Sequence, residues 1–276
     1  MSFKNVFVHL SSLDASQRLI SAAINTGLRF DAHVTGLYQV PDIDLSKFLT
    51  PDLGLTRIDQ RLSEVHDERL AIRELFREAG KKASVSVEWI DSESHFASNL
   101  PRQARYADLI IVGQDTMDAA RRGAPNLESF VLASGRPVLA IPTIGIAGEL
   151  GSHALVAWDE SRESARAVHD AVPFLKTARA VSVINVTDSS KKAAESTATA
   201  TTLCHHLARH GIQAEARHSV DSELSVAECL LSRSTELGAN LLIMGAYGHS
   251  RMRELVLGGA TRAILTEMTL PVLFSH

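Results

Sequence analysis

The sequence predicts an α/β protein of two tandem domains, each an open parallel sheet of five strands with helices on both faces. Apolar, β-branched runs alternate with helical patterns, the alternation occurs twice, and 276 residues suffice for two domains of ordinary size. We expect an N-terminal domain over residues 1–145 and a C-terminal domain over 150–276. The stretch "TIGIAGELGS" at 143–152 is the expected boundary.

The first strand and helix of the two halves have the same layout. "NVFVHLSSLDASQRLISAA" (5–23) and "HALVAWDESRESARAVHDA" (153–171) each give a strand, a polar turn and a helix. Aligning them places Ser11 opposite Asp159. A repeat of this length indicates a duplicated domain, because solenoid units are far shorter.

The ends of the two halves also match. "ADLIIVGQDT" (107–116) corresponds to "ANLLIMGAYG" (239–248), and "SGRPVLAIP" corresponds to "MTLPVLFSH". Each half closes on a short apolar strand of the PVL type. These two end strands could pair with each other, which would join the halves as a pseudo-dimer.

The first half is longer in its middle. Residues 41–57 carry Pro41, Pro51 and Gly54 and are expected to form a surface loop. A helix should follow and stop at Gly80, since apolar residues recur at helical spacing; they are Ile58, Leu62, Val65, Ile72, Leu75 and Ala79. In the second half the matching helix is expected over about 191–210, ending at Gly211.

Composition and charge exclude several classes of protein. The net charge of −4 and the pI near 6.3 disfavour a nucleic-acid or membrane-surface binder. Two cysteines cannot form a disulfide framework, and no apolar run approaches the roughly 20 residues of a membrane span. The N-terminus shows no signal-peptide pattern, so a soluble cytoplasmic protein is expected.

Glycines gather in "GANLLIMGAYGHSRMRELVLGGATRAIL". Gly245 ends an apolar strand, Gly248 follows in the loop, and Gly258 and Gly259 precede a helical pattern. In parallel sheets ligands bind at the carboxyl ends of strands, and a helix N-terminus there can hold an anion. The segment also carries polar and cationic donors: His249, Ser250, Arg251 and Arg253. A phosphate-binding loop is one interpretation, and ordinary turn and cap glycines are the other.

The spacing Gly245-x2-Gly248-x9-Gly258 resembles the nucleotide-binding signature of the universal stress protein family, G-x2-G-x9-G-[S/T]. The resemblance covers the whole chain as two tandem copies. It implies Rossmann-like sheets of the adenine nucleotide alpha-hydrolase type. It also implies that the ligand is ATP, which could bind together with Mg²⁺. Gly259 departs from the signature, because a Ser or Thr is expected there.

The resemblance also implies roles for individual residues. Asp159 corresponds to the acid that contacts the nucleoside, and Val186 to the position whose backbone reads the adenine edge. Asp159 could instead be a helix N-cap, and Val186 a plain strand residue. The positions that resemble the family's ribose- and phosphate-contacting backbone are Gly245, Gly248, Gly258, Gly259 and Ala260. His249, a donor of the same segment, and Thr261, a hydroxyl two residues after Gly259, are counted with them as binding candidates.

The matching positions of the first half do not support the same chemistry. Ser11 replaces Asp159, and Thr116 stands in the place of Gly248. Asp115 and Asp118 would repel a polyphosphate. We therefore expect one competent site in the C-terminal domain and a degenerate N-terminal one.

Three hypotheses on function follow. The first is a regulatory or stress-response protein that binds ATP, without catalytic residues or a metal site of its own and with homodimerisation allowed. The second is a slow ATPase, and the third is a scaffold that acts through the 41–57 insertion and a sheet edge, independently of nucleotide. His206 and His210 share a helical face with Cys204 nearby, but the sequence offers no third zinc ligand at standard spacing.

Overall fold

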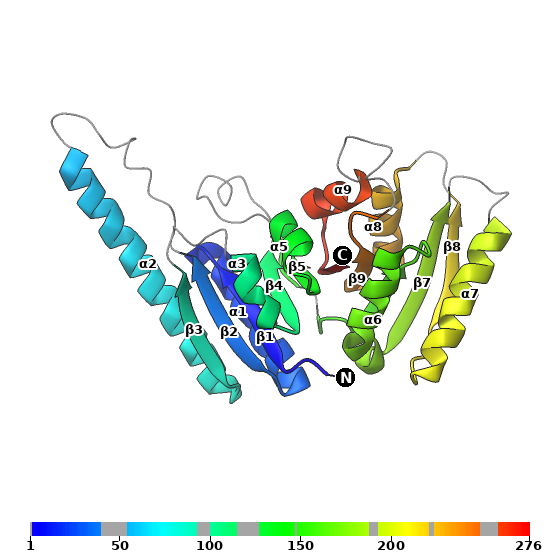
Figure 1. Ribbon diagram of the computed structural model, residues 1–276, viewed down its shortest axis with the longest axis horizontal. Coiled ribbons are helices and arrows are strands. Elements are labelled where there is room, and N and C mark those ends of the chain that lie inside the picture. The colour runs from blue at the N-terminus through cyan, green and yellow to red at the C-terminus, as the bar shows by residue number, and fades with distance from the viewer. Residues whose placement is uncertain are drawn as a thin grey trace. The chain divides into compact units, whose positions relative to one another are not determined.

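The structure, a computed structural model, divides the chain into two compact units, Phe3–Ser134 and Gly135–His276. In both units strands and helices alternate (Figure 1), which confirms the predicted α/β class. No helix in the described part of the chain is long and apolar enough to span a bilayer. The described residues are 2–39, 54–92, 100–114, 127–146, 148–187, 193–220, 224–248 and 259–276.

The N-terminal unit is a parallel sheet in the order β3-β2-β1-β4. Its interior strand β1 is fully buried at alternate positions, Val6 and Val8. Helices α1 and α2 contact each other, as do α3 and α5. The strands are β1 (Asn5–Leu10), β2 (His33–Gln39), β3 (Val87–Ser92) and β4 (Leu109–Gly113), and the helices are α1 (Leu13–Phe30), α2 (Gly54–Ala83), α3 (Leu100–Gln103), the 3₁₀ helix η3 (Ala104–Tyr106) and α5 (Leu127–Ala133).

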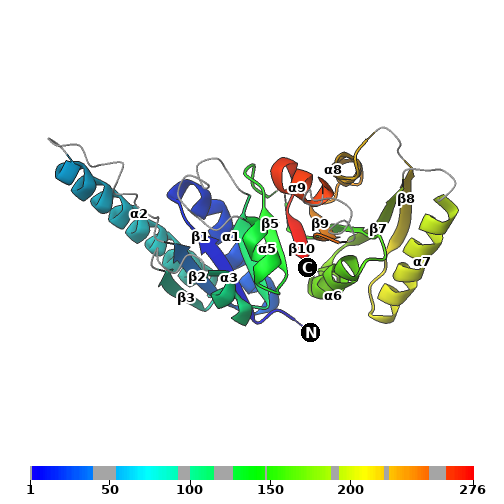
Figure 2. The same ribbon diagram turned by 45° about the horizontal axis from the view of Figure 1, so that its top comes forward.

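Helix α2 is longer than the sequence pattern predicts, and it lies along β3 (Figure 1, Figure 2). It begins at Gly54, so the prediction of a loop through residue 57 was wrong at its C-terminal end. The helix also continues through Gly80, which was expected to end it. A Cβ atom on Gly80 would lie 2.5 Å from Val87 Cγ1, so the glycine allows α2 to pack closely on β3.

The C-terminal unit is a sheet in the order β5-β10-β9-β6-β7-β8. All neighbours are parallel except β5 and β10, which are antiparallel with Leu139 opposite Leu273. The expected pairing of the two PVL end strands is therefore confirmed. The strands are β5 (Val138–Ile141), β6 (His153–Ala157), β7 (Ala180–Thr187), β8 (Glu215–Val220), β9 (Leu241–Gly245) and β10 (Val272–Ser275), and the helices are α6 (Arg162–Thr177), α7 (Ala193–Arg209), α8 (Val226–Glu236) and α9 (Gly259–Glu267).

The strand order of this unit reverses between β6 and β9. The chain leaves β6 toward β7 and β8, then crosses back to β9 on the other side of β6. Helix α6 packs on β9 and β10, α7 packs on β7 and β8, and α8 contacts α9 (Figure 2). In open α/β sheets the crevice at such a reversal, at the carboxyl ends of the strands, is where ligands bind.

Candidate functional site

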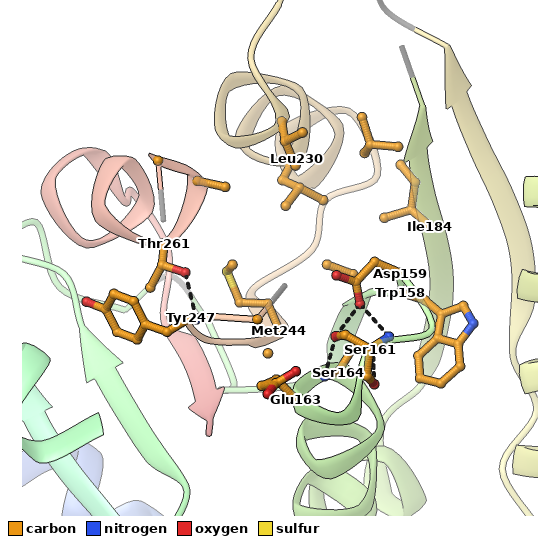
Figure 3. A pocket seen from close by; sticks show the side chains of 17 residues that line it. Trp158, Asp159, Ser161, Glu163, Ser164, Ile184, Leu230, Met244, Tyr247 and Thr261 are labelled. Carbon is orange, nitrogen blue, oxygen red and sulfur yellow. Dashed lines mark hydrogen bonds between the residues drawn. The ribbon is translucent and has the colours of Figure 1, made fainter. Parts of the chain in front are cut away.

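A cavity of about 360 Å³ lies at this reversal, within the size range of small-molecule sites (Figure 3). Its walls come from the ends of β6, β7 and β9 and from the first turns of α6, α8 and α9. Seven of the nine positions predicted from the sequence line it: Asp159, Val186, Gly245, Gly248, Gly259, Ala260 and Thr261. His249 and Gly258 lie outside the described residues.

The turn from β6 into α6 is a network of short hydrogen bonds. Ser161 is the helix N-cap, because its Oγ accepts from the Ser164 N–H at 3.1 Å. Asp159 Oδ1 in turn accepts from the Ser161 N–H at 3.0 Å and from its hydroxyl at 2.5 Å. Asp159 is therefore not the N-cap; it holds the N-cap residue, Ser161, in place. Among the described residues nothing bonds its second carboxylate oxygen, which is available to a ligand.

The wall beside Asp159 is apolar. Ile184 of β7, Leu230 of α8 and Met244 of β9 are 1%, 2% and 6% exposed, and all three side chains line the cavity. Val186 lies near the end of β7, in regular register with Ser219 of β8. Moving a flat, apolar group such as a purine ring from water onto this wall would cost little free energy.

Gly245 is required by packing. A Cβ atom here would lie 2.5 Å from the carbonyl carbon of Glu163 and 2.5 Å from the amide nitrogen of Ser164. Both are backbone atoms, so no side-chain rotation can relieve the overlap. The glycine therefore lets the first turn of α6 lie against the end of β9, a reason that the sequence pattern did not reveal.

Gly248 is less constrained. A Cβ atom there would lie 3.3 Å from Glu163 Oε2 and 3.8 Å from Ser161 Oγ. These are side-chain atoms at the cavity, so small side-chain movements can relieve the contact. The missing side chain at Gly248 thus keeps space open beside the first turn of α6.

Two residues of the loops around the cavity have left-handed backbone without being glycine. Glu160 has φ 61° and Tyr247 has φ 58°. Such conformations are uncommon for non-glycine residues and gather at functional sites. The Tyr247 N–H donates to Thr261 Oγ1 at 3.3 Å, which ties the loop after β9 to the first turn of α9 (Figure 3).

Helix α9 directs its N-terminus at the cavity. Gly259, Ala260 and Thr261 form its first turn and line the cavity wall. The first N–H groups of a helix have no partner within it, and the helix dipole adds positive potential, so this turn suits an anionic oxygen. A Cβ atom on Gly259 would meet none of the described residues within 4 Å, so on their side the place of the expected Ser or Thr is sterically open.

Sequence reasoning missed Glu163, whose side chain is 11% exposed and lies at the floor of the cavity. It also missed the cap at Ser161. The cap has a sequence signal, because a serine before a helical pattern favours an N-cap. Glu163 has none, since only the packing of α6 on β9 turns this side chain toward the ligand space.

The corresponding turn of the N-terminal unit is built differently. Strand β1 leads to α1 through Ser11 and Ser12 alone, and Ser12 makes no side-chain cap bond. Instead, Glu68 of α2 accepts from the Leu13 N–H at 2.9 Å. The expected obstructions after β4, at residues 115–126, lie outside the described residues, so a degenerate N-terminal site remains a prediction.

Comparisons with known proteins agree on the fold. A universal stress protein from Archaeoglobus fulgidus is similar over 98% of this chain and 95% of its own, with a TM-score of 0.70 and 16% identity. A functionally unknown protein from Pseudomonas aeruginosa is similar over 99% and 92%, with a TM-score of 0.60 and 14% identity. The cytoplasmic domain of a prokaryotic cation chloride cotransporter is similar over 98% of this chain and 94% of its own, with a TM-score of 0.51 and 12% identity. No curated protein matches the sequence.

The parallel strands, the crossover helices and the cavity at the strand reversal define a Rossmann-like α/β protein. Residues 152–276 match the sequence profile of the universal stress protein family. This match covers the C-terminal unit, where it confirms the predicted resemblance to the family.

Proposed function

We propose that the C-terminal unit binds ATP in the cavity between β6 and β9, and that the protein acts as a nucleotide-binding regulator in a stress response. The observation that carries the proposal is the composition of the cavity walls. An apolar wall, a carboxylate and a helix N-terminus line a single space. These three surfaces match the base, the ribose and the phosphates of a nucleotide.

In this arrangement the adenine lies against Ile184 and Leu230, where its ring displaces water from apolar side chains. The backbone of Val186 is placed to meet the edge of the base. The free oxygen of Asp159 accepts from a ribose hydroxyl.

The phosphates lie over Gly248 toward the first turn of α9. The N–H groups of Gly259, Ala260 and Thr261 supply donors without any side chain, so the absence of a hydroxyl at Gly259 removes one donor and leaves the others. His249 and Gly258, the two motif positions outside the described residues, are proposed to contribute here on the family resemblance alone. Mg²⁺ is proposed to accompany the phosphates, since it binds through phosphate oxygens and a small number of carboxylates.

Calorimetric titration of ATP tests the proposal. The unaltered protein should bind about one ATP per chain, and Gly248→Asp should abolish binding by filling the space beside Glu163 with a second carboxylate. Gly113→Asp is the control at the strand end of the N-terminal unit, where a Cβ atom has room 3.5 Å from Leu19. It should leave both affinity and stoichiometry unchanged. Absence of binding to the unaltered protein would leave the scaffold hypothesis.

A phosphate-release assay then separates a binder from an ATPase. We expect turnover well below ~1 s⁻¹, the low end of ordinary enzymes. A faster rate, abolished by Gly248→Asp, would assign the protein to the hydrolases.

A further inference from the structure

Glu163 places a carboxylate inside the proposed nucleotide site. It belongs to the first turn of α6, two residues after the N-cap Ser161, and only 9% of the residue is exposed. Figure 3 shows its side chain at the floor of the cavity, beneath Met244 in that view. Charged side chains are seldom buried to this degree unless they are paired.

The pairing of Glu163 is incomplete. Its Oε1 accepts from Arg162 Nη2 at 3.2 Å, but that arginine side chain is 93% exposed, and an ion pair with so exposed a partner neutralises little charge. Among the described residues no hydrogen bond reaches Oε2. This oxygen lies 3.3 Å from the position a Cβ atom of Gly248 would occupy, so its free acceptor capacity faces the space beside Gly248.

The position of this carboxylate determines which ligand groups can bind favourably beside it. A carboxylate accepts hydrogen bonds from ribose hydroxyls, but it cannot bond a phosphate oxygen, which is also an anionic acceptor. Asp159, Glu163 and the first turn of α9 line one cavity, and Glu163 Oε2 lies beside Gly248. A nucleotide that extends from Asp159 to α9 therefore comes close to Glu163. A divalent cation between the two anions would convert their repulsion into shared coordination.

Resting on the proposed function, we infer that Glu163 is a specificity-determining residue that makes the site prefer a nucleoside to its metal-free polyphosphate. Binding of ATP then depends on a divalent cation, whereas binding of adenosine does not. The site thereby distinguishes metal-bound ATP from metal-free ATP.

A purely structural role for Glu163 has different consequences. An acidic residue in the first turn of a helix is stabilised by the helix dipole. If this were its whole purpose, Glu163→Gln would lower the thermal midpoint and leave the order of ligand affinities unchanged. The two roles are thus separated by selectivity rather than by stability.

The experiment is a set of calorimetric titrations with adenosine, AMP and ATP, each in excess EDTA and each in Mg²⁺. Three proteins are compared: the unaltered chain, Glu163→Gln, and Glu160→Gln. Glu160 lies in the turn just before α6 and loses the same charge, but it is exposed and does not line the cavity. The thermal midpoint of each protein is recorded to show that it is folded.

For the unaltered protein we expect adenosine to bind about tenfold or more tightly than ATP in EDTA, and Mg²⁺ to restore ATP binding. Glu163→Gln should strengthen ATP binding in EDTA by about tenfold and remove most of the Mg²⁺ dependence, while adenosine changes less. Glu160→Gln should behave like the unaltered protein.

Equal affinity for ATP in EDTA and in Mg²⁺, unaffected by Glu163→Gln, would overturn the inference and leave the proposed ATP site standing. Absence of binding by all three ligands to the unaltered protein and to Glu163→Gln would instead overturn the proposed function.

Discussion

Gly245→Ala should destabilise the C-terminal unit without involving any ligand. The added Cβ atom would lie 2.5 Å from two backbone atoms of α6, and real Cβ atoms essentially never come closer than 3.0 Å. The end of β9 and the first turn of α6 must therefore separate by about 0.5 Å or more. Overpacking of this kind costs about 1–3 kcal/mol, and no rotamer change can relieve it here.

The matched control is Gly113→Ala, the corresponding strand end in the N-terminal unit. A Cβ atom there would lie 3.5 Å from Leu19 Cδ1, which is an ordinary contact. Replacing a glycine by alanine, at a position that alanine tolerates, stabilises a protein by about 0.4–1 kcal/mol because it lowers the conformational entropy of the unfolded chain. We therefore expect a neutral to slightly stabilising change at Gly113, and a loss of about 2 kcal/mol at Gly245.

The two tryptophans allow each unit to be followed alone. Trp89 lies in β3 of the N-terminal unit, and Trp158 follows β6 in the C-terminal unit. In a Trp89→Phe background, urea unfolding monitored by fluorescence reports the C-terminal unit, and the transition of Gly245→Ala should move to lower urea. Thermal unfolding should shift by roughly 5–10 °C for a unit of this size.

The packing argument is refuted if Gly245→Ala unfolds within about 0.5 kcal/mol of the unaltered protein, the scatter typical of inconsequential surface changes. If the variant is stable but no longer binds ATP, the glycine serves the ligand after all.

Three further predictions follow from the same structure. Gly259→Ser should leave the thermal midpoint nearly unchanged, since its Cβ atom meets no described residue within 4 Å, and should tighten ATP binding about three- to tenfold through one added donor, as measured by calorimetry. Asp159→Asn keeps an oxygen that can accept from the Ser161 N–H, so folding should be preserved while ATP affinity falls about tenfold or more; unchanged affinity would confine Asp159 to a structural role. The hydrogen bond and charge of Lys4 lower the pKa of Asp31, so the pair stabilises the fold above the carboxyl's unfolded pKa, and this contribution is lost as the pH falls through the lower folded pKa. In an NMR titration Lys4→Ala should raise the pKa of Asp31, and a value that does not move would contradict the assignment.

Much of the fold could be predicted because duplicated patterns support each other. The run "LLIMG" alone fits a buried strand or a short helix, but its match to "LIIVG" in the other half indicates a strand in both. The antiparallel pair of β5 and β10 was foreseeable from two copies of one short apolar segment. The two errors concern α2, where Gly54 and Gly80 were interpreted as breakers. Glycine is disfavoured within helices, but at Gly80 contact with Val87 outweighs that preference.

The spacing of the motif predicted several of the residues that line the site. The spacing located Gly245, Gly248 and Gly259 at one cavity, because a motif records positions that share a ligand space. It could not give the reason for each glycine. That reason depends on distances between segments remote in sequence, such as β9 and α6, which no local pattern encodes.

The packing of Gly245 and the charge of Glu163 are two consequences of one contact. Because Gly245 has no side chain, the first turn of α6 reaches the end of β9, and that approach brings the Glu163 carboxylate into the cavity. A larger residue at position 245 would move α6 away and shift both the charge and the cap at Ser161. The glycine thus influences ligand selectivity indirectly, by fixing where a carboxylate lies. In the N-terminal unit the nearest described atom to a Cβ on Gly113 is 3.5 Å away, so within the described part of the chain the same residue type carries no such constraint.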